Sequence, residues 1–126
     1  MQLVLFLSTM LFAATARAGT VSIYVNAAPK DYLGQQLVYD LKQDVIASAE
    51  FHLIYSQSQA LYSISIVTIS DAQHDGTEYS TAYSAVLIAK PDVFVDNQVG
   101  ICGADRIQSC AANIISGLGG DIDTLR

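Results

Sequence analysis

The chain has 126 residues, the length of a single domain, and 52% of them are hydrophobic while only 14% are charged. An intrinsically disordered chain would be less hydrophobic and more highly charged, so the composition argues against disorder. Asp and Glu outnumber Lys and Arg by 12 to 6, and a net charge of −6 argues against the positive surfaces that bind nucleic acid or anionic lipid.

The first 18 residues are predicted to be a secretory signal peptide. Residues 3–14 form an almost unbroken apolar run, too short to span a bilayer, and Ala-Arg-Ala at 16–18 follows as a cleavage pattern. No Lys or Arg precedes the run, so an uncleaved anchor and a buried first helix are the alternatives. We therefore expect a periplasmic or secreted protein, with one domain over residues 19–126 and no membrane span after cleavage.

A strand and a helix open the predicted domain. Residues 21–25 are mostly β-branched or aromatic and predict the strand. Asp31 is a suitable N-cap for a helix over about 32–48. The apolar residues of that helix recur every fourth position on one face: Leu33, Leu37, Leu41 and Val45.

Three further strands are predicted at residues 51–55, 61–69 and 78–90. The last two should form a hairpin, because the polar loop between them contains the turn signal Asp75-Gly76. A register centred on the midpoint of that loop pairs Ser63 with Ser84 and Ser65 with Ala82 on one face. On the other face it pairs Ile64 with Tyr83.

This alternation predicts an apolar face, with Tyr62, Ile64 and Tyr83, that packs on the helices. The opposite face is small and polar, and we expect it to be the binding surface: Ser63, Ser65, Ala82 and Ser84. Larger apolar residues of the same parity surround it: Leu61, Val67, Val86 and Ile88. Because this apolar rim is too large to leave in water, a protein partner is implied, and a homodimer is one possible form.

The C-terminal third is less regular. Residues 92–104 are compatible with a short edge strand at 93–95 or with a loop. A second helix is predicted over about 105–118, with its apolar residues on one face: Ile107, Cys110, Ile114 and Leu118. Three glycines should end that helix, and residues 121–126 should fray. The glycines are Gly117, Gly119 and Gly120. The order β-α-β-β-β-α predicts a two-layer α+β sandwich, with a mixed sheet of about four strands and both helices on one face.

Cys102 and Cys110 are predicted to form a disulfide, because an even number of cysteines in a secreted chain is most simply paired. A continuous helix between them would hold the Cα atoms too far apart, so Gly100 and Gly103 must let the chain turn back. The alternative is two free thiols, with Cys110 filling the core. The spacing is not that of a C-x-x-C redox pair.

No catalytic residue, metal or cofactor is predicted. The chain has no G-x-S-x-G motif, and its two His and two Cys are too few for most metal sites. The leading hypothesis is therefore a non-enzymatic accessory protein that acts by protein–protein contact in the cell envelope. One alternative is an acidic inhibitor of a cationic extracellular enzyme such as a lysozyme, steered by charge. Another is an enzyme with an unrecognised site around His52 or His74.

The stretch from Ala47 to Ile69 contains a helix end, FHLIY, a short polar turn and LYSISIVTI. This pattern resembles small envelope domains, namely the N-terminal domain of the Tol-system translocation protein and some outer-membrane assembly accessory proteins. The resemblance implies the same β-α-β-β-β-α plan and carries over no functional residue.

Overall fold

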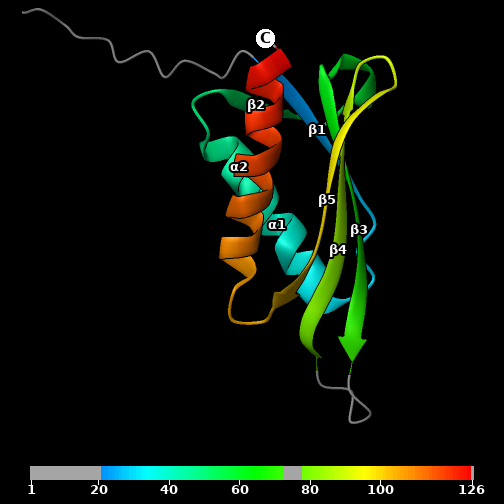
Figure 1. Cartoon of the computed structure of the whole chain (residues 1–126), viewed down its shortest axis with the longest axis vertical. Coiled ribbons are helices and arrows are strands. Elements are labelled where there is room, and N and C mark those ends of the chain that lie inside the picture. The colour runs from blue at the N-terminus through cyan, green and yellow to red at the C-terminus, as the bar shows by residue number, and fades with distance from the viewer. Residues whose placement is uncertain (1–20, 73–77, 126) are drawn as a thin grey trace, which may run out of the picture.

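Two helices cover one face of a five-stranded sheet in the computed structural model, which describes residues 21–72 and 78–125 (Figure 1). The elements are β1 (Val21–Ala27), α1 (Tyr32–Ala47), β2 (Phe51–Ile54), the 3-10 turn η1 (Gln57–Gln59), β3 (Tyr62–Ala72), β4 (Glu78–Ala89), β5 (Val93–Gly103) and α2 (Ile107–Leu125). The predicted two-layer α+β sandwich is confirmed, with five strands where about four were expected. The predicted signal peptide and His74 lie outside the described residues.

The strand order is β2-β1-β3-β4-β5. β1 is parallel to both of its neighbours, whereas β4 is antiparallel to both β3 and β5. Neither helix of the described residues is long and apolar enough to cross a membrane.

The apolar stripe of α1 lies buried against the sheet, as its spacing predicts. The sheet side of this core comes from alternate residues of β1, β3 and β4, which all point toward the helices. Ile23, Ile64 and Leu87 are fully buried there, while Tyr62 and Tyr83 are partly buried against the same core. The face assignment made from alternation is therefore right for the hairpin.

The hairpin register differs from the predicted one by four residues. Ser63 pairs with Ile88 and Ser65 with Val86, so the predicted Ser63–Ser84, Ser65–Ala82 and Ile64–Tyr83 pairs are wrong. β4 starts at Glu78 as expected, but β3 continues three residues beyond its predicted end, to Ala72. The hairpin is therefore centred two residues later in the chain than the midpoint of the predicted loop. Because the shift is an even number of residues, every side chain stays on the predicted face.

β5 is a regular edge strand of 11 residues, not a short strand or loop. Its alternation was hard to recognise because most of its large apolar residues are exposed. Val95 is only partly buried against the core, and Cys102 is the one residue of β5 that is fully buried there. Tyr83 pairs with Gly100 across the strands, and a Cβ at Gly100 would lie 2.8 Å from the Tyr83 hydroxyl. The glycine therefore leaves room for the tyrosine ring.

α2 continues seven residues beyond its predicted end at residue 118 and includes all three glycines that were expected to end it. Two of the glycines mark close approaches of the helix to other elements. A Cβ at Gly117 would overlap the side chain of Gln98 on β5, and one at Gly119 would lie 3.2 Å from the Phe51 ring. Ile122 is buried, so core packing extends the helix through a tail that was expected to fray.

Candidate binding surface

The four predicted binding residues all lie on the sheet face that the helices leave open. The register places Ser63 and Ser65 of β3 on the same side as Ala82 and Ser84 of β4, opposite the buried Ile64. Ser63 itself is buried, while the other three are partly exposed. His52 also lies on this face, in register with Ser22.

Large hydrophobic side chains are strongly exposed on the same face. Two cross-strand rows place them side by side: Val67–Ser84–Val99, and next to it Ile69–Ala82–Ile101. We call these six residues the β3–β5 patch. Its four large members are between 57% and 75% exposed, and Phe94 farther along β5 is 62% exposed. Contiguous exposed apolar surface of this kind is typical of an interaction site.

The patch has a definite relief. Ala82 and Ser84 form a low track along β4, and larger side chains stand on both sides of it. Val67 and Ile69 line one side on β3, and Val99 and Ile101 line the other on β5. A flat opposing surface would leave this track unfilled, whereas a ridge of matching width would fill it.

The open face is also free of charge over a long stretch. Between residues 63 and 69 on β3, 80 and 88 on β4, and 94 and 101 on β5, no described residue directed to this face is Asp, Glu, Lys or Arg. Asp96 belongs to the helix side, where its carboxyl group hydrogen-bonds that of Asp121 on α2. The acidic excess of the chain is therefore carried elsewhere.

The disulfide between Cys102 and Cys110 is present and joins β5 to the start of α2, with a Cα–Cα distance of 6.2 Å. Cys102 follows Ile101 of the patch directly and is fully buried. The bond therefore holds the end of β5 that carries the patch against the helix layer.

A buried carboxylate anchors the same region from behind. Asp31 caps α1, where its Oδ2 accepts a hydrogen bond from the Gly34 N–H at 3.0 Å and its Oδ1 accepts one from the Thr68 hydroxyl at 2.6 Å. Burial by itself raises the pKa of Asp31, but hydrogen bonds from Thr68, Thr81 and Gly34 outweigh this effect and lower it. Thr68 lies between Val67 and Ile69, so α1 is tied to the strand segment behind the patch.

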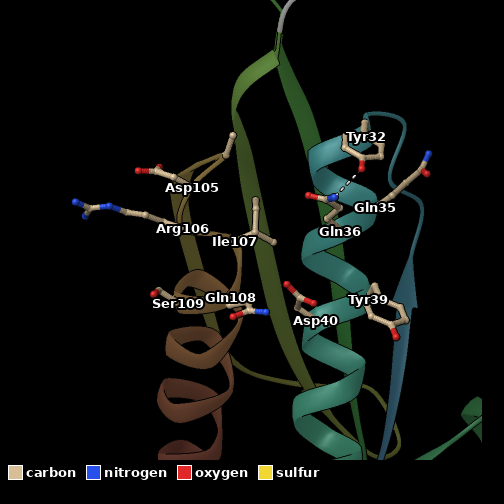
Figure 2. A pocket seen from close by; sticks show the side chains of 11 residues that line it. Tyr32, Gln35, Gln36, Tyr39, Asp40, Asp105, Arg106, Ile107, Gln108 and Ser109 are labelled. Atoms are coloured by element: carbon tan, nitrogen blue, oxygen red, sulfur yellow. Dashed lines mark hydrogen bonds between the residues drawn. The ribbon is translucent and has the colours of Figure 1, made fainter.

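A second concave region lies between the N-terminal parts of the two helices (Figure 2). It has a volume of about 670 Å³ and is mostly polar. Gln36 and Asp40 of α1 and Gln108 of α2 point into it, whereas Arg106 points away, and the Gln36 amide donates a hydrogen bond of 2.8 Å to the Tyr32 hydroxyl. These side chains can form hydrogen bonds with a polar ligand.

The histidine of the described residues and the cleft between the helices lie on different sides of the sheet. His52 lies on the open sheet face, on the opposite side of the sheet from the hydroxyl of Ser109 in the cleft. Within residues 21–72 and 78–125, no group of three or more His, Cys, Asp or Glu side chains is placed to hold a metal ion.

Two acidic pairs lie on the helix side. Burial and the charge of Asp40 raise the pKa of Asp44. The pKa of Asp121 is raised and that of Asp96 lowered, chiefly by the hydrogen bond between the two carboxyl groups. These pairs place negative charge on α1 and at the contact between β5 and α2, away from the β3–β5 patch.

No protein-family model matches the chain, and no curated protein sequence matches it. Among solved structures, the chain is similar to a dodecamer of a PelC point variant from Paraburkholderia phytofirmans, with 15% identity, a TM-score of 0.44, and coverage of 78% of this chain and 85% of that one. It is also similar to the uncharacterized lipoprotein B from Nitrosomonas europaea, with 14% identity, a TM-score of 0.37, and coverage of 94% and 79%. Neither likeness bears on function.

Proposed function

We propose that this protein is a non-enzymatic accessory protein of the cell envelope, periplasmic or secreted, that acts by protein–protein contact through its open sheet face. The β3–β5 patch is the observation that carries the proposal. Its large side chains lie in adjacent rows on three neighbouring strands and are mostly exposed. Covering such a surface with a protein partner removes apolar area from water, which stabilises the complex.

The location of the protein is supported by two independent features. The disulfide between Cys102 and Cys110 is of a kind that persists in oxidising compartments. The predicted signal peptide at residues 1–18 indicates export.

The charge distribution favours this function over that of an acidic enzyme inhibitor. An inhibitor steered by charge would present carboxylates on its contact surface. Here the large exposed apolar surface is uncharged, and carboxylates such as Asp40 and Asp44 lie on the helix side.

The proposal can be tested by capture of binding proteins from envelope extract with wild-type and variant chains. Ile101→Arg should abolish capture without unfolding the domain, because Ile101 is 75% exposed and the new side chain can reach water. Ile46→Arg, at an exposed hydrophobic position on α1, is the matched control and should capture as the wild type does. Equal capture by the Ile101→Arg variant would refute the assignment of the face.

A further inference from the structure

The occupant of the β3–β5 patch has to fit an uncharged surface on an acidic protein. With a net charge of −6, two copies of the chain repel each other wherever their carboxylates approach. The uncharged stretch of the open sheet face is a region where they can meet without bringing like charges together. A basic partner would instead gain most from the carboxylates on the helix side.

The relief of the patch also suits a copy of itself. If the Val67 and Ile69 ridge of one copy lies in the Ala82 and Ser84 track of another, twofold symmetry places the second copy's ridge in the first copy's track. One arrangement therefore fills both tracks at once. Facing sheets pack about 10 Å apart with interlocking side chains, as this contact requires.

We infer that the β3–β5 patch is covered by a second copy of this chain, packed face to face about a twofold axis that runs between β3 and β4, beside Ser84. This inference rests on the proposed function of the face and names its partner. Pairing of two β5 edges would be another way to join copies, because β5 ends the sheet. Edge pairing would leave Val67 and Ile69 exposed to water, so it does not account for the patch.

Sedimentation equilibrium over a range of concentrations tests this arrangement. The proteins compared are the wild type and two variants that carry opposite charges at position 84, Ser84→Lys and Ser84→Glu. The wild type should be a dimer. Ser84→Lys and Ser84→Glu should each weaken dimerisation by at least about 30-fold, because each places two like charges in an apolar contact. An equimolar mixture of the two variants should recover a dimer, since Lys and Glu then face each other near the axis.

Ser116→Glu, at an exposed position on α2, is the control and should dimerise like the wild type. Circular dichroism of each variant establishes that it is folded. Recovery of the dimer in the mixture, together with an unaffected control, supports the face-to-face arrangement.

Three results would overturn the inference: a monomeric wild type at all concentrations, a dimer that survives both Ser84 variants, or a mixture that stays monomeric. The first of these leaves the proposed function standing if Ile101→Arg still abolishes capture of a different protein. If Ile101→Arg affects neither capture nor dimerisation, the face itself is wrongly assigned and both proposals fail.

Discussion

Asp31 should contribute more to stability than any other carboxyl group described here, because it is buried and serves two elements at once. Its side chain accepts hydrogen bonds from the Gly34 N–H at the start of α1 and from the Thr68 hydroxyl on β3. Replacing it with Ala removes the N-cap, at a cost of about 1 kcal/mol. It also leaves the buried Thr68 hydroxyl without its acceptor, at a further cost of about 1–2 kcal/mol.

Asp31→Ala should therefore lower the free energy of unfolding by about 2–3 kcal/mol. In a domain of this size that corresponds to a fall in the thermal midpoint of about 10–20 °C. Urea unfolding followed by circular dichroism measures the first quantity, and a thermal scan measures the second. Asp31→Asn keeps an acceptor oxygen and is the matched control, with a smaller expected loss.

The pH dependence provides a second test of Asp31. Its pKa is lower in the folded protein than in the unfolded chain, so its ionised form is stabilised by folding. That contribution is present above the unfolded pKa of about 3.9 and is lost as the pH falls through the lower folded pKa. Asp31→Asn should therefore flatten the acid limb of the stability profile. Two results would refute this account. One is a loss in the free energy of unfolding below about 0.5 kcal/mol for Asp31→Ala, which is the effect of an ordinary surface substitution. The other is an unchanged acid limb of the stability profile for Asp31→Asn.

Three further predictions concern the disulfide, the two sheet faces and the carboxyl pair. Non-reducing peptide mapping should find Cys102 linked to Cys110, and Cys110→Ala should reduce stability by about 2–3 kcal/mol in chemical denaturation, whereas two alkylatable thiols in unreduced protein would contradict the bond. Ile64→Asp should unfold the domain because it buries an unpaired charge. Ser65→Arg should leave the thermal midpoint nearly unchanged and weaken association. If circular dichroism and sedimentation show the opposite pattern, the two sheet faces have been assigned the wrong way round. The pKa of Asp121 is raised in the folded protein, so this residue contributes to folding stability only while it is protonated. The contribution is complete below the pKa of the unfolded chain and declines as the pH rises through the higher pKa of the folded protein. Asp121→Asn should therefore reduce the decline of the thermal midpoint above the ordinary Asp range, and a decline equal to that of the wild type would show that Asp121 does not cause it.

Features set by short-range chemistry could be predicted from the sequence. The Asp31 cap and the apolar stripe of α1 depend on contacts within one helix or between one helix and any apolar sheet face. The Cys102–Cys110 bond depends on the chain between the two cysteines turning back on itself. The alternation of β3 and β4 identified both faces correctly even though the predicted register was wrong.

Features that depend on a neighbour distant in the chain could not be predicted in this way. The glycines at 117 and 119 resemble helix terminators, but the side chains of Gln98 and Phe51 occupy the space beside them and α2 continues past both. β5 has apolar residues that face away from the core, so periodicity alone did not identify the strand.

The sequence by itself determined which side chains of the β3–β4 hairpin face the helices, because alternation along a strand is a local property of extended backbone. Only the tertiary structure decided that β5 lies beside β4 and places Val99 and Ile101 in the same rows as Val67 and Ile69. Those rows join residues that are far apart in the chain, and no periodic pattern records which strands become neighbours. The composition of the patch was therefore predictable in part, but its continuity across three strands comes from long-range strand pairing.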